Sequence, residues 1–154
     1  YLQRVNSGGA NFTDGQGQLW TADKAFATGS WGYTAGTAKS TTTAVAGTTD
    51  DALYQKWRSA PGEYKFSVPN GAYEVTLRFA EFEATNSSTR IMKITIEGIT
   101  VENTLNVNTL VGKATALDKT YQAAVADGML NIAFVKNGGK LDPMVAGIQV
   151  RQLP

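Results

Sequence analysis

One stretch of strict alternation constrains the fold more than any other part of the sequence. Between Tyr73 and Phe79, every second residue is large and apolar, and each residue between them is polar or charged. Side chains of an extended chain point alternately to opposite faces, so this pattern predicts a strand with one buried face. The pattern breaks at Glu81 and Phe82, where continued alternation would point the carboxylate inward. We expect the strand to end or bulge here, or to carry a buried carboxylate.

Shorter alternations of the same kind predict further strands, which lie around residues 2–6, 64–68, 92–96, 121–125, 130–134 and 148–150. Pro69-Asn70-Gly71 predicts a β-hairpin into the strand that begins near Tyr73, and Asp127-Gly128 predicts a second hairpin. Short strands at regular spacing, with almost no helical pattern, predict an all-β fold. The simplest such fold is a jelly-roll β-sandwich of two antiparallel sheets.

The length of 154 residues suits a single domain that covers residues 1–154. The chain begins at Tyr1 and has no charged segment followed by an apolar core, so we interpret it as a mature or excised segment of a larger protein. No apolar run is long enough to span a membrane. Lysine and arginine number 14 against 13 acidic residues, without long runs of either sign, so we expect neither a nucleic-acid nor a membrane partner.

The chain contains no cysteine and no histidine. These absences exclude disulfide scaffolds, thiol nucleophiles, catalytic triads built on histidine and nearly all zinc or copper sites. Carboxylate and carbonyl oxygens still leave a structural calcium ion open. We expect no other cofactor.

Aromatic residues occur in segments that lack clean periodicity. Trp31 and Tyr33 lie in a segment from Thr28 to Thr49 that is too long for an ordinary connection, and Trp57 and Arg58 precede a turn. A sugar site pairs exposed aromatic rings with polar side chains, because sugars have apolar C–H faces and hydroxyl edges. A tryptophan in a small β-sandwich can equally belong to the core, as we expect for Trp20.

An enzyme would need a different arrangement. A glycosidase requires two carboxylates that face each other across a sugar, and the candidates are Asp50, Asp51, Glu81, Glu83 and Asp142. The fold sets the separation of these carboxylates, and no motif requires catalysis.

Several motifs together resemble the malectin-like domains, in the same order along essentially the whole chain. They are Arg4-Val5-Asn6-Ser7-Gly8-Gly9, Thr13-Asp14, Trp20 with Ala22-Asp23, residues 47–55 (GTTDDALYQ), Val68-Pro69-Asn70-Gly71-Ala72-Tyr73, Arg78-Phe79-Ala80-Glu81, Arg90, Glu97-Gly98, Asp127-Gly128-Met129-Leu130 and Asp142-Pro143. The resemblance implies a jelly-roll sandwich whose loops at one end form a sugar cleft. It also implies a secreted or cell-surface carbohydrate-binding module, of the kind appended to bacterial glycoside hydrolases and other exported enzymes.

In animal malectin the cleft holds a glucose disaccharide with aromatic side chains and an aspartate. By position, the resemblance places Trp31 at one of these aromatics and Asp142 at or beside the aspartate. The chain departs from the family at Ser59, Glu83 and Ala84, which stand where the family has aromatic residues. Since rings are lost and a carboxylate is gained, we expect a more polar site.

The resulting hypothesis assigns two roles. We expect Trp31, Tyr33 and Trp57 to provide stacking faces, while Arg58, Glu83, Arg90 and Asp142 bind sugar hydroxyls. The expected partners are a poly- or oligosaccharide and a covalently linked catalytic domain, and the chain itself is expected to be a monomer. The alternatives are an extracellular domain of the same fold that binds protein, and a glycoside-cleaving enzyme.

Overall fold

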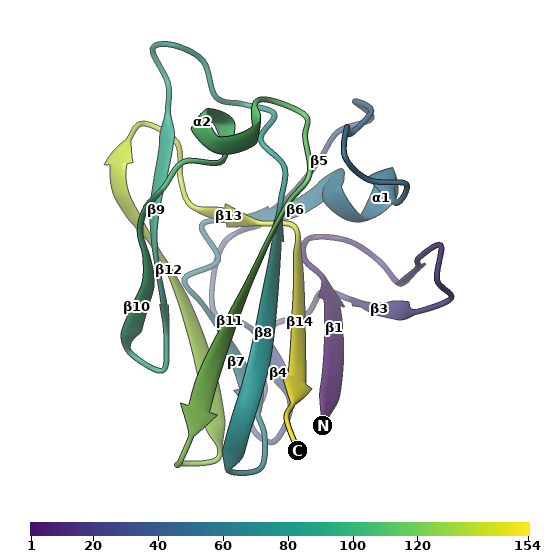
Figure 1. Ribbon diagram of the computed structural model, residues 1–154, viewed down its shortest axis with the longest axis vertical. Helices are drawn as coiled ribbons and strands as arrows, with labels where there is room; N and C mark the ends of the chain where they lie inside the picture. Colours follow the sequence, from purple (N-terminus) through teal and green to yellow (C-terminus); the bar gives the residue numbers. More distant parts are fainter.

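The structure is a computed structural model that describes residues 1–154, and its strands run mostly along the long axis of the molecule (Figure 1). The two short helices, α1 (Asp51–Tyr54) and α2 (Val107–Val111), lie at one end together with several loops. Both chain termini lie toward the opposite end, side by side. The backbone of Gln152 donates to the carbonyl of Tyr1 at 2.9 Å, which holds the two termini together.

The strands form three sheets. In spatial order, the six-stranded sheet contains β11 (Leu117–Val125), β8 (Gly71–Phe79), β14 (Gly147–Gln152), β1 (Leu2–Asn6), β3 (Leu19–Ala22) and β2 (Phe12–Thr13). The five-stranded sheet contains β10 (Ile99–Leu105), β9 (Arg90–Ile96), β12 (Met129–Gly139), β7 (Glu63–Ser67) and β4 (Trp31–Tyr33). The three-stranded sheet contains β13 (Met144–Val145), β6 (Lys56–Ser59) and β5 (Thr37–Ser40).

The predicted all-β sandwich is confirmed, because side chains from the two large sheets pack into one main core. The alternation in β8 has the expected consequence, since Tyr73, Val75, Leu77 and Phe79 are all fully buried. Almost all strand pairs are antiparallel, and the exception is the parallel pair of β1 and β3. The three-stranded sheet was not expected from the sequence.

Both predicted hairpins are wrong. β7 pairs with β12 and β4, whereas β8 pairs with β11 and β14, so the turn at Pro69-Asn70-Gly71 carries the chain from one sheet to the other. The Asp127-Gly128 turn does the same between β11 and β12. A tight turn fixes the reversal of the chain but not the pairing of its arms, and here burial of both inner faces requires the arms to separate. Asn70 joins the two turns, since its side chain accepts from Gly128 N at 2.8 Å and donates to Ala126 O at 3.0 Å.

A second, smaller core lies beside the first and contains Trp20, Val45, Leu53, Tyr54 and Ala80. The expectation that Trp20 is core is confirmed, because its side chain is fully buried. Its indole Nε1 donates to Asp14 Oδ2 at 2.9 Å, and the guanidinium of Arg78 lies 4.4 Å from the centre of its ring. This core fixes the segment before α1 against the six-stranded sheet.

Neither helix has the length and apolar character that crossing a membrane requires. The residues 28–49, which showed no periodicity, contain β4 and β5 within otherwise irregular backbone.

The main core predicts the stability of one pair of variants. Leu77→Ala should lower the free energy of unfolding by about 2–5 kcal/mol, because it leaves a cavity at a fully buried position. Leu19→Ala removes a side chain that is half exposed and should change the free energy of unfolding by about 0.5 kcal/mol or less. Urea denaturation measures both values, and equal losses would contradict the assignment of Leu77 to the core.

Candidate functional site

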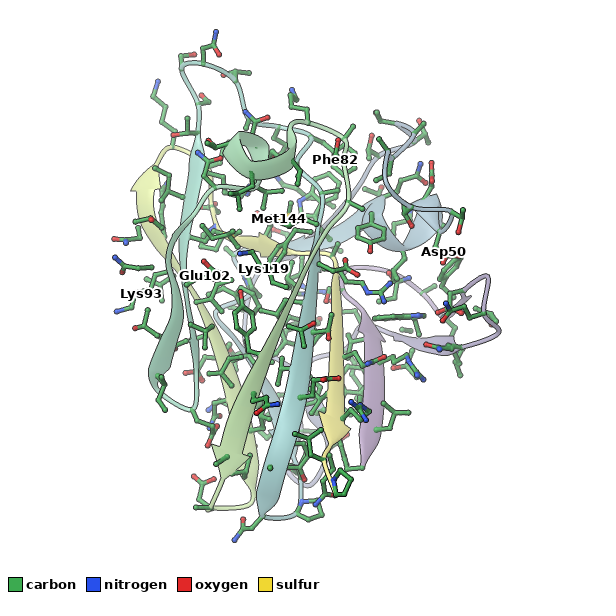
Figure 2. The ribbon with its side chains drawn as sticks, viewed as in Figure 1. Asp50, Phe82, Lys93, Glu102, Lys119 and Met144 are labelled. Carbon is green, nitrogen blue, oxygen red and sulfur yellow. The ribbon has the colours of Figure 1, made fainter.

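A stacked pair of aromatic rings marks the end of the molecule that carries the loops. Phe82 follows the end of β8 and is partly exposed, while Trp57 on β6 is buried. Their ring centres lie 5.4 Å apart with an interplanar angle of 26°. Figure 2 labels Phe82 among the loops at this end, above Met144. The partly exposed phenyl ring is therefore supported from behind by an indole.

Next to Phe82, the break in alternation proves to be both a strand end and a buried carboxylate. β8 ends at Phe79, and Glu81 is 1% exposed. Arg90, which is 2% exposed, binds Glu81 through Nε to Oε2 at 2.7 Å. Glu81 Oε1 also accepts from the backbone N–H of Glu83 at 2.8 Å and of Ala84 at 3.1 Å. The buried charges are thus paired and hydrogen-bonded, as burial of charge requires.

Arg90 also binds two further groups. Its Nη2 binds Glu83 Oε2 at 2.7 Å, and its Nη1 donates to the carbonyl oxygen of Asp142. Although burial acts to lower the pKa of Arg90, its bonds to Glu81 and Glu83 raise the pKa above the usual value. One guanidinium therefore holds the start of β9, the residues after β8 and the segment before β13 in one arrangement.

Glu83 lies at the surface between two cations. Its side chain is 29% exposed and accepts from Lys39 Nζ at 2.7 Å as well as from Arg90. Partial burial acts to raise the pKa of Glu83, but the hydrogen bonds from Lys39 and Arg90 outweigh it and lower the pKa below the usual value. The Glu83 carboxylate is consequently ionised at neutral pH and accepts hydrogen bonds. A general acid would need a protonated carboxyl group.

Asp142 lies in the same region with an exposed side chain. Its carboxylate is 60% exposed, and Oδ1 is 3.7 Å from Lys136 Nζ. Its backbone is held by Arg90. We call Lys39, Phe82, Glu83, Arg90 and Asp142 the loop-end cluster. Of these, Glu83, Arg90 and Asp142 were expected from the sequence, whereas Lys39 and Phe82 were missed as site residues.

Arg58 and Tyr33 belong to a different network on the other face of β6. Arg58 is 6% exposed, its Nε binds Asp23 Oδ2 at 2.6 Å, and its guanidinium lies 3.3 Å from the centre of the Tyr33 ring. Tyr64 Oη donates to the same carboxylate at 3.0 Å, and Gly8 N donates to it at 2.6 Å. This network ties the turn after β1 to β6 and β7.

The expectation that Trp31 and Trp57 are exposed for stacking is wrong. Trp31 is only 9% exposed and stacks on Phe66 of the neighbouring strand with 6.2 Å between ring centres, and Trp57 is 4% exposed. Both tryptophans lie in strands of three or four residues, which are too short for alternation to reveal a buried face. Arg58 and Arg90, expected to bind hydroxyls, are likewise buried.

Two hollows open on the surface, and neither is lined by Asp142. The first has a volume of about 250 Å³ and is lined by Gly8, Gly9, Ala10, Ala38, Lys39, Ser40 and Lys56. The second has a volume of about 200 Å³ and is lined by residues of α2 together with Glu102 and Lys119. Figure 2 labels these two side chains below α2, between β10 and β11. These two side chains pair at 3.0 Å. No group of three or more acidic side chains is placed to hold a metal ion.

The buried ion pair predicts a large effect on stability. Arg90→Met should lower the free energy of unfolding by about 3–5 kcal/mol, because it leaves the Glu81 carboxylate buried without a counter-charge. The double variant that adds Glu81→Gln should recover part of this loss, since the amide is neutral and still accepts from the two backbone N–H groups. Urea denaturation tests both. A double variant no more stable than Arg90→Met would contradict the pairing.

The lowered pKa of Glu83 predicts an acid-sensitive contribution to stability. Since its pKa is lower in the folded chain than the ordinary value of 4.5, the ionised group stabilises the fold above that value. The contribution is lost as the pH falls through the folded pKa. Wild type should therefore lose more stability than Glu83→Gln between roughly pH 6 and pH 3, measured by urea denaturation. Identical pH slopes would contradict the ion pairs at Glu83.

Comparison with known proteins finds a matching family model, a related protein sequence and related solved structures. The model of the Malectin domain matches residues 1–148. Malectin-B of Xenopus laevis is 29% identical over 86 residues, which are 54% of this chain and 31% of that protein. A crystal structure of Bacteroides uniformis beta-glucuronidase matches with a TM-score of 0.93 and 29% identity over 100% of this chain and 18% of that chain.

The ANX2 ectodomain from Arabidopsis thaliana matches with a TM-score of 0.78 over 99% of this chain and 50% of that chain, and at 19% identity this shows a shared fold. The chain spans less than a third of Malectin-B and less than a fifth of the beta-glucuronidase chain. Because the family model covers nearly the whole length, this chain belongs to the Malectin domain family.

Proposed function

We propose that the chain is a non-catalytic carbohydrate-binding module and that the loop-end cluster contacts the sugar. The observation that carries this proposal is the partly exposed Phe82 ring beside the pre-ordered carboxylate of Glu83. A ring can cover the C–H face of a sugar, and an ionised acceptor can bind its hydroxyls. Membership of the Malectin domain family supports the same function.

Each member of the loop-end cluster has a distinct role in this proposal. Phe82 stacks on the sugar with Trp57 as its support, and Glu83 and Asp142 accept hydrogen bonds from hydroxyls. Lys39 and Arg90 hold Glu83 in place, and Arg90 also fixes the backbone of Asp142. Trp31, Tyr33 and Arg58 stabilise the scaffold instead of contacting ligand, because their contacts lie within the protein. The affinity should be modest, since a shallow wet site loses contact energy to ordering and desolvation.

The acidic residues support a binding role over a catalytic one. Glu81 is buried, and Arg90 pairs with both Glu81 and Glu83. A glycosidase needs one carboxyl group with a raised pKa, whereas the pKa of Glu83 is lowered. In this proposal catalysis belongs to a covalently linked domain, such as a glycoside hydrolase, in a longer exported protein. The match to a small part of a beta-glucuronidase chain and the match to a plant ectodomain agree with that setting.

The surface gives less support to the alternative of a protein-binding domain. The exposed large apolar side chains within named elements are Leu2, Leu19, Ile99, Leu110 and Val135. They come from five different elements, so no strand or helix presents a row of them. An interface with a protein would need a contiguous apolar centre.

Binding to a panel of neutral polysaccharides tests the proposal. Phe82→Ala should weaken binding to the best ligand roughly fivefold through loss of stacking, and Glu83→Gln roughly tenfold through loss of a charged acceptor. Calorimetric titration measures both affinities. Phe26→Ala is the matched control, because Phe26 is also partly buried but lies next to β4, and it should bind as wild type does. A wild-type chain that binds no glycan would contradict the function, and equal binding by wild type and Phe82→Ala would contradict the site.

A further inference from the structure

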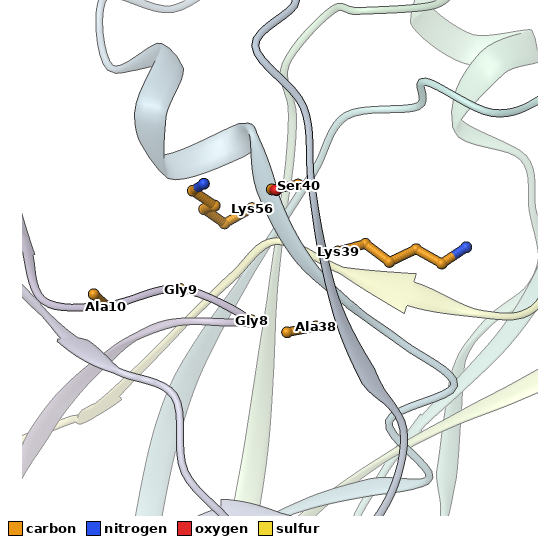
Figure 3. Close-up of a pocket in the computed structure, with 7 residues that line it drawn as sticks. All are labelled: Gly8, Gly9, Ala10, Ala38, Lys39, Ser40 and Lys56. Carbon is orange, nitrogen blue, oxygen red and sulfur yellow. The ribbon is translucent and has the colours of Figure 1, made fainter.

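The larger hollow lies on the opposite face of the β5–β6 pair from Glu83. Side chains alternate along β5, so Lys39 points to one face and its neighbours Ala38 and Ser40 point to the other. Figure 3 shows this directly, since the Lys39 side chain extends away from Ala38, Ser40 and Lys56. Lys56 is the cross-strand partner of Ser40, which places the two side chains on the same face. The hollow and the loop-end cluster therefore share one residue, Lys39, whose side chain lies on the face of Glu83.

The wall of this hollow exposes backbone. On one side is the turn formed by Gly8, Gly9 and Ala10, and on the other are the small side chains of Ala38 and Ser40. Gly8 has a φ of +72°, and a Cβ on it would lie 2.3 Å from the carbonyl oxygen of Trp57, so only glycine permits this approach to β6. The amide of Ala10 donates to no backbone carbonyl. The amides of Gly8 and Gly9 and the carbonyls of Gly9 and Ala10 are already hydrogen-bonded within the protein. The Ala10 amide and the Ser40 hydroxyl consequently remain available to a polar ligand.

The hollow carries one uncompensated positive charge. The ion pairs of the chain leave Lys56 without a partner. The ammonium of Lys39 is neutralised on the opposite face by Glu83, and no carboxylate lines the hollow. Asp23, which lies behind Gly8, is neutralised by Arg58. The charge balance of the hollow therefore favours a ligand with a single negative charge.

We propose that this hollow binds one uronic acid residue of an acidic saccharide. The carboxylate pairs with the Lys56 ammonium, while ring hydroxyls bind the Ser40 hydroxyl and the Ala10 amide. A volume of about 250 Å³ suits one sugar ring, because pockets for larger drug-sized molecules begin at about 300 Å³. The inference rests on the proposed carbohydrate-binding function, and it adds a second contact region and an acidic class of ligand.

The test compares an oligogalacturonate with the same oligosaccharide after reduction of its carboxyl groups. Lys56→Gln should bind the acidic form roughly fivefold more weakly than wild type and the reduced form equally well, since one partly exposed ion pair is lost. The matched control is Lys93→Gln on β9, which removes a partly buried lysine that also lacks an ion pair and should leave both affinities unchanged. The difference between wild type and Lys56→Gln should shrink at high salt.

Two further measurements keep the inference separate from the proposed function. Ala38→Leu should fill the hollow without changing charge and weaken binding of the acidic form, with a thermal unfolding curve that checks its fold. Equal affinity of wild type and Lys56→Gln for the acidic form would overturn this inference, while loss of neutral-glycan binding in Phe82→Ala would still support the loop-end cluster. Tighter binding of a sulfated oligosaccharide of the same length would overturn the carboxylate assignment. No binding of any glycan would overturn both proposals.

Discussion

The buried guanidinium of Arg90 is the interaction on which the loop end depends. Two carboxylates and a backbone carbonyl surround it. Glu81 and Glu83 come from one segment, and the carbonyl of Asp142 comes from a segment 52 residues away from Arg90 in the chain. Removing charge from water is costly, so such a group persists only when its partners are placed with good geometry. The backbone N–H groups of Glu83 and Ala84 complete the coordination of Glu81. The loops are held in one conformation because the buried Arg90 guanidinium needs all of these ion pairs and hydrogen bonds.

Strand β6 connects this cluster to the rest of the molecule. Trp57 and Arg58 are adjacent, so their side chains point to opposite faces of the strand. Trp57 stacks on Phe82 at the loop end, and Arg58 binds Asp23 near the turn that follows β1. A single short strand therefore positions both the loop-end cluster and the hollow behind it. Any shift of β6 would be transmitted to both surfaces.

The sequence predicted the buried face of a strand where the alternation of apolar and polar residues was long and regular. The buried face of β8 and the break at Glu81 were readable because seven residues, from Tyr73 to Phe79, alternate in one strand. The burial of Trp31 was not, because β4 has three residues and its stacking partner Phe66 is 35 positions away in the printed sequence. Pairing of strands also escaped prediction, since turn residues specify a reversal without specifying which sheet receives the next strand. The break in alternation at Phe82 was readable from the sequence, but its stacking on Trp57 was not.

The proximity of the two termini has a mechanical consequence. The chain enters through β1 and leaves through β14, which are paired neighbours in the same sheet, and both ends lie far from the loops (Figure 1). A polypeptide attached at either end would emerge from the pole opposite Glu83, and one attached at both ends would leave and return at nearly the same point. A domain with adjacent termini can be inserted into a host domain with little disturbance of the host's backbone. Its loops then point away from the host.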